Sequence, residues 1–226
     1  MLSSDRSLPA AAAAARYDLV ILDFDGTLAD SITWFAGVFN EVARRYRFHQ
    51  ATPAELEALR GEGVAGILRA LGVARWKVPL IARHMRKLVA RDIAKIALFP
   101  GALQLIHDLA EAGLRLAMVS SNAEANVARL LGPEATALID HFACGASLHG
   151  KVAKFRAVLD AAAVAPARAI AIGDEVRDVE AAAAAGIASG AVDWGYATRA
   201  ALEARRPTVL FHEMSAITPF VLGLTA

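Results

Sequence analysis

Four short apolar segments constrain the fold of this chain more than any other feature of its sequence. They are Tyr17–Leu22, Leu114–Val119, Ala169–Ile172 and Ile187–Val192. A continuous apolar run of this length is typical of a strand that is buried on both faces of a parallel sheet. Segments of helical pattern separate the four runs. The sequence therefore predicts an α/β fold with a doubly wound, Rossmann-like parallel sheet.

The helical segments are recognised by the spacing of their apolar residues. One predicted helix face consists of Leu103, Ile106, Leu109 and Ala110. A second face, rich in alanine, consists of Val179, Ala182, Ala183 and Gly186. Apolar residues three and four positions apart indicate amphipathic helices that can pack against the sheet.

The interval between the first two predicted strands is too long for a simple crossover. It contains two long apolar stripes at helical spacing, Ile32, Phe35, Ala36, Phe39, Val42, Ala43 and Tyr46, and then Ile81, Met85, Leu88, Val89, Ile93 and Ile96. Such stripes predict a small helical bundle with its own core. We therefore expect a poorly ordered leader over 1–15, an α/β core over 16–30 and 99–226, and an α-helical cap over 31–98.

Composition excludes several classes of function. The 226 residues include 24 basic and 23 acidic side chains, so nucleic acid finds little net positive charge to bind. The sequence has no uncharged apolar stretch of about 18 residues, which disfavours a membrane protein. Its single cysteine, Cys144, cannot form an internal disulfide and favours a reducing compartment. We expect a cytoplasmic protein that acts on a small molecule.

Acidic and hydroxyl side chains follow the predicted strands. They are Asp23, Asp25, Ser120, Asp174 and Asp178. In a doubly wound sheet these strand ends lie at one edge, where ligands bind. Four carboxylates at one edge repel each other unless a cation neutralises them, and oxygen ligands suit Mg²⁺. A divalent ion beside a carboxylate nucleophile indicates phosphoryl-transfer chemistry.

Four short motifs resemble those of the haloacid dehalogenase superfamily. They are Asp23-Phe24-Asp25-Gly26-Thr27-Leu28, Val119-Ser120-Ser121-Asn122, Lys151, and Gly173-Asp174-Glu175-Val176-Arg177-Asp178, in that order. Together with the helical insertion, the resemblance covers nearly the whole chain and is greatest to the phosphoglycolate-phosphatase-like branch. It implies a phosphatase that acts on a small phosphorylated metabolite with Mg²⁺ as cofactor.

The resemblance and the chemistry of the side chains assign roles to individual residues. Asp23 is the expected nucleophile, Asp25 the general acid and base, and Lys151 the cation that contacts the phosphoryl group. Mg²⁺ is expected to bind Asp23, Asp25 through its backbone carbonyl, Asp174 and Asp178. Phosphate or substrate is expected to bind Thr27, Ser120, Ser121, Asn122 and Lys151. If the register of this motif is shifted by one residue, Ser121 takes the place of Ser120 as the phosphate ligand. Asn122 could instead cap a helix. The Thr27 hydroxyl is expected to form a hydrogen bond that holds Asp25.

Several alternatives stay open at this point. A sugar-phosphate mutase uses the same aspartyl phosphate, and a non-catalytic binding module could share the fold. Dehalogenation is disfavoured because Asp25 supplies an acid that this reaction does not need. We interpret Trp34, Phe35 and Phe39 as core of the cap. Arg44, Arg45 and Arg60 could face the active site from the cap, but we interpret them as a solvated helix face. Glu175 is interpreted as a residue that favours the start of a helix, and the segment Trp194-Gly195-Tyr196 receives no catalytic role.

Overall fold

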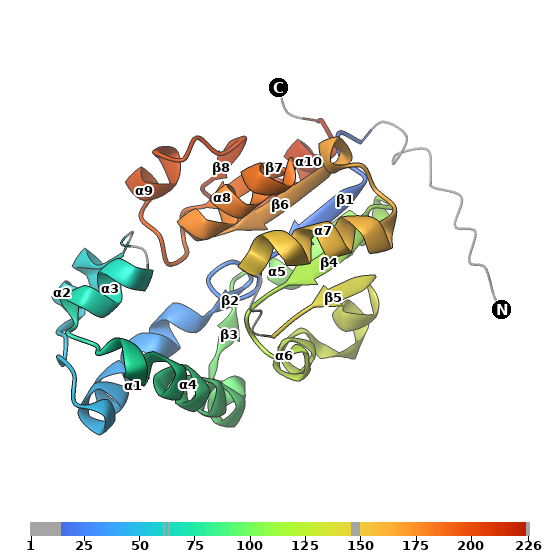
Figure 1. The fold of residues 1–226 in the computed structure, drawn as a ribbon. Coiled ribbons are helices and arrows are strands. Elements are labelled where there is room, and N and C mark those ends of the chain that lie inside the picture. The colour runs from blue at the N-terminus through green and yellow to red at the C-terminus, as the bar shows by residue number, and fades with distance from the viewer. Residues whose placement is uncertain (1–14, 61, 63, 146–149, 225–226) are drawn as a thin grey trace.

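A six-stranded parallel sheet forms the centre of the computed structural model, which describes residues 15–60, 62, 64–145 and 150–224 (Figure 1). The strand order is β5-β4-β1-β6-β7-β8, and each pairing is parallel. The strands are β1 (Leu19–Leu22), β4 (Arg115–Val119), β5 (His141–Ala143), β6 (Ala169–Gly173), β7 (Ala188–Val192) and β8 (Val209–Phe211). The predicted α/β fold is confirmed.

Helices cover both faces of this sheet. They are α5 (Ala102–Glu111), α6 (Glu124–Ala137), α7 (Gly150–Ala162), α8 (Val176–Ala185), α9 (Arg199–Glu203) and α10 (Ile217–Val221). Val20 and Leu22 of β1 belong to a core shared with α5, α6 and α10, while Leu19 and Ile21 belong to a core shared with α7 and α8. Successive side chains of a strand point to opposite faces, so β1 must be apolar along its whole length.

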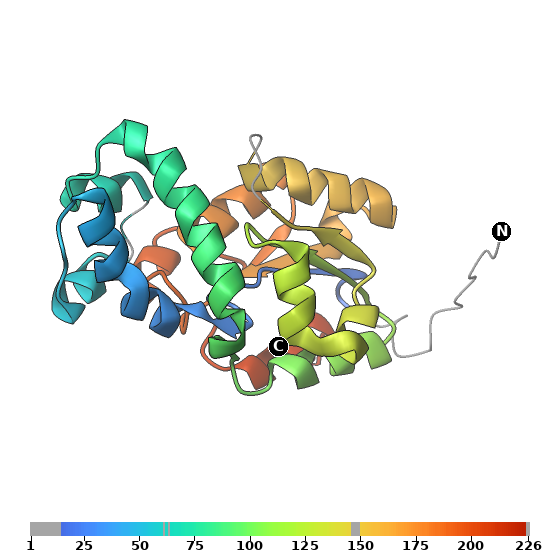
Figure 2. The same cartoon turned by 90° about the horizontal axis from the view of Figure 1, so that it is seen from below.

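A helical insertion follows β1 and stands beside the carboxyl end of the sheet (Figures 1 and 2). It begins and ends in a short antiparallel ribbon, which pairs Ala29 with Leu98. Its elements are β2 (Ala29–Asp30), α1 (Ser31–Tyr46), α2 (Pro53–Ala58), α3 (Val64–Ala70), α4 (Val78–Asp92) and β3 (Ala97–Leu98). Short 3-10 turns complete the described chain at Arg75–Lys77, Ile93–Lys95, Pro166–Arg168 and Met214–Ala216.

The insertion has a small core of its own. Its fully buried members are Phe39, Ala43, Ala51, Leu71 and Val73. Side-chain caps fix where two of its helices begin: Asp30 accepts from the Thr33 N–H at α1, and Thr52 forms a capping box with Glu55 at α2. The division into cap and core stays a prediction. Residues 1–14 of the predicted leader lie outside the described residues, whereas Ala15 is buried.

Two predicted helix faces differ from the observed ones. Leu103 is 41% exposed, and Leu105 takes its place in the core beside Ile106 and Leu109. On α8, Ala183 is exposed and Ala181 is buried. In both cases the helix is rotated by about one position, which the apolar spacing alone does not fix when alanine and leucine occur on both sides.

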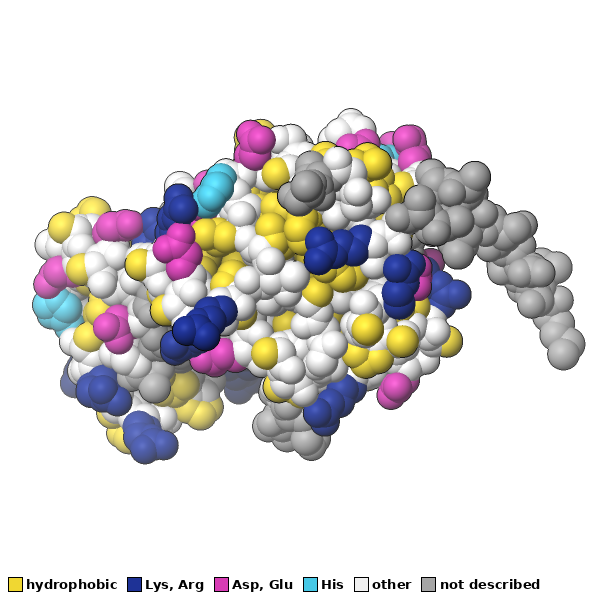
Figure 3. Space-filling view, turned by 90° about the horizontal axis from the view of Figure 1, so that it is seen from above, with side chains coloured by type: hydrophobic (Ala, Val, Ile, Leu, Met, Phe, Trp, Pro, Cys, Tyr) yellow, Lys and Arg dark blue, Asp and Glu magenta, His cyan; other side chains and the backbone are white. Residues whose placement is uncertain are grey.

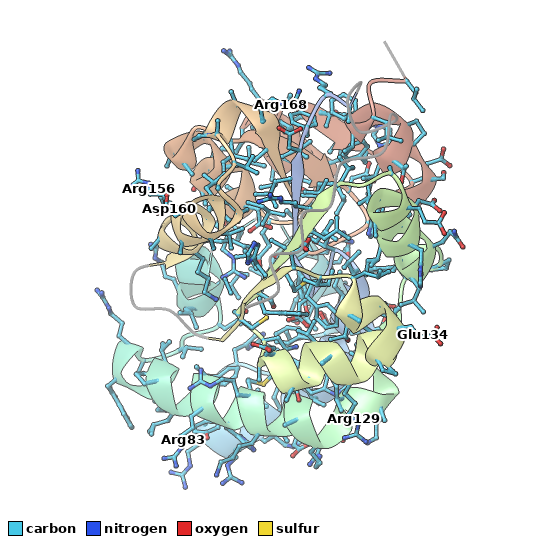
Figure 4. The ribbon with its side chains drawn as sticks, turned by 90° about the vertical axis from the view of Figure 1, so that its right-hand side faces the viewer. Arg83, Arg129, Glu134, Arg156, Asp160 and Arg168 are labelled. Carbon is cyan, nitrogen blue, oxygen red and sulfur yellow. The ribbon has the colours of Figure 1, made fainter. Side chains whose placement is uncertain are left out.

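The surface is of mixed charge. On the face shown in Figure 3, acidic and basic side chains are interspersed, in keeping with the net charge of +1. Figure 4 shows Arg83 of α4 pointing away from the body of the protein, whereas Arg156 of α7 donates to the Ala184 carbonyl at 3.2 Å. Among the described residues, no helix has the length and apolar character needed to cross a membrane.

Candidate active site

Three carboxylates meet at the carboxyl edge of the central strands. Asp23 follows β1, Asp174 follows β6, and Asp178 lies in the first turn of α8. One carboxylate oxygen of each lies within 4.8 Å of the others, and all three side chains are buried. The pairing of β1 with β6 accounts for this proximity, since the Asp23 N–H donates to the Ile172 carbonyl at 2.9 Å. Three of the four carboxylates that the sequence places at this edge therefore lie together.

Lys151 joins two of these carboxylates. It lies in the first turn of α7, and its Nζ is 2.6 Å from Asp23 Oδ2 and 2.5 Å from Asp178 Oδ1. The nearby Lys154 points elsewhere, because its Nζ donates to the carbonyls of Ser120 at 2.6 Å and Gly145 at 2.5 Å. Of the two lysines, Lys151 is therefore the one that contacts the acidic group.

The buried carboxylates carry more negative charge than Lys151 can neutralise. Burial raises the pKa of Asp23, although Lys151 opposes this shift. Burial and the charge of Asp23 raise the pKa of Asp174 well above its usual value. Burial lowers the pKa of Lys151, but Asp178 and Asp23 outweigh it, so that the lysine remains charged. These three carboxylates therefore offer the oxygen ligands and the negative charge that a hard divalent cation prefers.

Asp174 is held by two hydrogen bonds and by two closely packed glycines. Its Oδ1 accepts from Thr27 Oγ1 at 2.8 Å, and its Oδ2 accepts from the Tyr196 N–H at 2.7 Å. Gly26, at φ +80°, and Gly195 pack so closely that an added Cβ would lie 2.2 Å and 2.1 Å from Asp174 atoms. The expectation that Thr27 holds Asp25 is wrong. The Thr27 hydroxyl instead orients the carboxylate of Asp174, which follows the neighbouring strand β6, and the Thr27 side chain is fully buried.

Asp25 lies apart from the three clustered carboxylates. Asn122 Nδ2 donates to both of its oxygens, at 3.1 and 3.3 Å, and Asn126 on α6 holds the Asn122 amide at 2.9 Å. Burial raises the pKa of Asp25, while hydrogen bonds from Asn122 and Ser31 lower it. The net shift of the Asp25 pKa is upward, which is the direction that a general acid requires.

The two serines of the second motif differ in their exposure to solvent. Ser120 is buried, and its Oγ accepts from the Asn122 N–H at 3.0 Å, whereas Ser121 is exposed. The alternative that Asn122 caps a helix is wrong, because α6 has Ala123 as its N-cap residue and Asn122 faces Asp25. Glu175 does cap α8, in a reciprocal box with Asp178.

Sequence reasoning assigned no contact within the site to Arg60 or to Trp194. Arg60 was interpreted as solvated, but its guanidinium donates to the carbonyls of Gly195 at 2.7 Å and Tyr196 at 3.3 Å. Trp194 Nε1 donates to the Thr27 carbonyl at 3.1 Å. Arg44 and Arg45 are exposed, as expected. His149, two residues before Lys151 in the sequence, lies outside the described residues.

Comparisons with known proteins agree with this geometry. The family model described as haloacid dehalogenase-like hydrolase matches residues 20–192. A phosphoglycolate phosphatase from Synechococcus elongatus is 28% identical, over 91% of this chain and 97% of the relative. The tyrosine-protein kinase PtkA from Mycobacterium tuberculosis is 32% identical, over 86% of this chain and 68% of the relative.

A solved structure extends the likeness to the fold. A haloacid dehalogenase-like hydrolase from Bacteroides fragilis superposes with a TM-score of 0.78 over 89% of this chain and 99% of that one, at 21% identity. At this identity the superposition bears on the fold alone. The resemblance drawn from the four sequence motifs is confirmed.

Proposed function

This chain belongs to the haloacid dehalogenase-like hydrolase family, and we propose that it hydrolyses a small phosphomonoester with the help of Mg²⁺ and an aspartyl-phosphate intermediate. The enzyme class, a phosphatase, follows from the family and from the phosphoglycolate phosphatase among its relatives. The metal, the intermediate and the substrate class are the proposal. The observation that carries them is the buried group of Asp23, Asp174 and Asp178 with Lys151 across two of its members.

The residues present fit a magnesium ion. Asp23, Asp174 and Asp178 offer only oxygen atoms, and these are close together and buried. Mg²⁺ prefers such ligands and retains water molecules, so three carboxylates are a sufficient protein contribution. When bound, the ion would neutralise negative charge that the carboxylates and a phosphoryl group share.

The first chemical step places the phosphoryl group on Asp23. A carboxylate oxygen of Asp23 forms a bond to phosphorus while the bond from phosphorus to the substrate oxygen breaks. Asp25 donates a proton to that leaving oxygen, and the upward shift of its pKa favours this role. The Lys151 ammonium, already 2.6 Å from Asp23, stabilises charge on the phosphoryl oxygens during the transfer.

The second step returns Asp23 to its free form. Asp25, now a carboxylate held by Asn122, accepts a proton from water as the water oxygen attacks phosphorus. The bond between phosphorus and Asp23 breaks, and inorganic phosphate forms. The sum of both steps is one phosphomonoester and one water converted to an alcohol and phosphate, with each catalytic group restored.

A small substrate is proposed because the insertion covers the site. Arg60 of the insertion reaches the loop that holds Asp174, so the approach to the carboxylates is restricted on that side. Exclusion of bulk water by such a cover protects an aspartyl phosphate during the first step. We therefore expect poor turnover of phosphoproteins compared with small phosphomonoesters.

The experiment is a screen of small phosphomonoesters, including phosphoglycolate and sugar phosphates, with p-nitrophenyl phosphate as a generic substrate. Phosphate release that needs Mg²⁺ and is absent from Asp23→Asn supports the proposal. Transfer of the phosphoryl group to a second hydroxyl of the substrate would favour a mutase instead, and transfer to a protein tyrosine would favour the activity named for the PtkA relative. Absence of any turnover would favour a binding module.

A further inference from the structure

Tyr196 connects the helical insertion with the acidic group. Its N–H donates to Asp174 Oδ2 at 2.7 Å, its hydroxyl lies 3.1 Å from Ser31 Oγ at the start of α1, and its carbonyl accepts from Arg60. Its ring packs edge-on against Phe35 of α1 at 6.3 Å between centroids. One residue of the core therefore touches two parts of the insertion and one carboxylate of the site.

Arg60 holds the other end of this connection. Its Nη2 donates to the Gly195 carbonyl and its Nε to the Tyr196 carbonyl, so a single planar guanidinium binds two consecutive peptide groups. Its Nη1 is held by Glu57 at 2.8 Å, which fixes the plane of the group. A lysine has one ammonium and no fixed plane, and it cannot reproduce this paired contact.

The loop that Arg60 binds cannot move without moving Asp174. A Cβ on Gly195 would lie 2.1 Å from the Asp174 Cβ, and one on Gly26 would lie 2.2 Å from Asp174 Oδ2 and 2.7 Å from the Tyr196 ring. The backbone of both glycines therefore lies directly against the Asp174 side chain, and the Tyr196 N–H is hydrogen-bonded to it. A displacement at Gly195 or Tyr196 is therefore transmitted to the carboxylate.

We propose that Arg60 is a positioning residue that couples docking of the helical insertion to the orientation of Asp174, and hence to divalent metal affinity. The inference rests on the proposed function, because it assumes that Asp174 is a metal ligand. By linkage, the effect is reciprocal: a bound metal favours the arrangement in which Arg60 contacts the loop, and loss of Arg60 weakens metal binding.

The test is direct binding of Mn²⁺ to metal-free protein, measured by electron paramagnetic resonance of the free ion. Mn²⁺ serves as the probe because it takes the same carboxylate and water ligands as Mg²⁺. We expect Arg60→Ala to weaken binding by about tenfold, the lower end of what loss of an orienting contact costs a metal site. Arg60→Lys should fall between Arg60→Ala and the wild type.

Arg83→Ala is the matched control, because Arg83 is an exposed arginine of the same insertion and points away from the protein (Figure 4). It should bind Mn²⁺ like the wild type. Equal affinity of Arg60→Ala and Arg83→Ala would overturn the inference, even if Arg60→Ala melted at a lower temperature. Failure of the wild type to bind Mn²⁺ would instead overturn the proposed metal site, and with it the premise.

Discussion

Replacement of Lys151 by methionine should lower both the maximal rate and the stability, and added Mg²⁺ should restore mainly the stability. The Lys151 side chain is 14% exposed, and its Nζ contacts Asp23 at 2.6 Å and Asp178 at 2.5 Å. Methionine retains most of the aliphatic volume and removes the charge. The two carboxylates then lose the cation that lies between them.

The expected size of the effect follows from these contacts. Loss of one charged donor aimed at a developing oxyanion costs about 10²–10³ in the maximal rate. Removal of one partner from a buried ion pair costs about 3–5 kcal/mol of stability. Because a divalent ion would neutralise the same carboxylates, added Mg²⁺ should recover much of the stability and little of the rate.

Lys154→Met is the matched control for this variant. Lys154 is three residues away and also donates two short hydrogen bonds, but its partners are the carbonyls of Ser120 and Gly145. Hydrogen bonds from a charged group contribute about 1.5–3 kcal/mol, so this variant should lose stability too. The loss should exceed the small change that is typical of a surface substitution.

The assay is steady-state hydrolysis of p-nitrophenyl phosphate at saturating Mg²⁺, together with thermal melting of both variants. Lys151→Met should lose far more of the maximal rate than Lys154→Met, although both melt at lower temperature than the wild type. A near-normal rate in Lys151→Met beside a severe defect in Lys154→Met would refute the reasoning.

Three further predictions concern the carboxylates. Asp23→Asn should remove nearly all turnover, because it deletes the nucleophile. It should melt no lower than the wild type, because it also deletes one buried charge. Turnover close to that of the wild type would contradict this prediction. Calcium should inhibit the magnesium-supported reaction, since it accepts bidentate carboxylates and a looser shell that spoils in-line attack; equal rates with either ion would count against the geometry. Burial raises the pKa of Asp23 from 3.8 to about 7, so the stability that its protonation contributes is present below about pH 4 and is lost as the pH rises through 7. Metal-free protein should therefore melt at lower temperature at pH 8 than at pH 5, and saturating Mg²⁺ should reduce that difference; a melting temperature that rises with pH would exclude this effect.

The strand segments and the acidic residues could be predicted because each depends on local sequence. A strand buried on both faces must be apolar throughout, and four such runs mark β1, β4, β6 and β7. Strands β5 and β8 were not predicted. They lie at the two edges of the sheet, are three residues long and are mostly only partly buried, so their sequences lack a continuous apolar run.

The contacts that orient the site could not be predicted, because they join residues far apart in the sequence. Thr27 and Asp174 are 147 residues apart, and Arg60 and Gly195 are 135 apart. Nothing near Arg60 in the sequence distinguishes it from the exposed Arg44 and Arg45. The aromatic and glycine residues of Trp194-Gly195-Tyr196, directly after a buried strand, were the one available signal that this loop packs closely against the site.

The central claim is that Asp23 becomes phosphorylated, and a burst experiment with Asp25→Asn tests it most directly. Nitrophenolate leaves without needing a proton, so the first step survives in this variant, while hydrolysis of the aspartyl phosphate slows because the base is absent. Rapid mixing with p-nitrophenyl phosphate and Mg²⁺ should then release about one nitrophenolate per chain before a slow steady state. The double variant Asp23→Asn, Asp25→Asn should show no burst. A burst of the same size in the double variant, or phosphate released as fast as nitrophenolate by Asp25→Asn, would contradict covalent catalysis by Asp23.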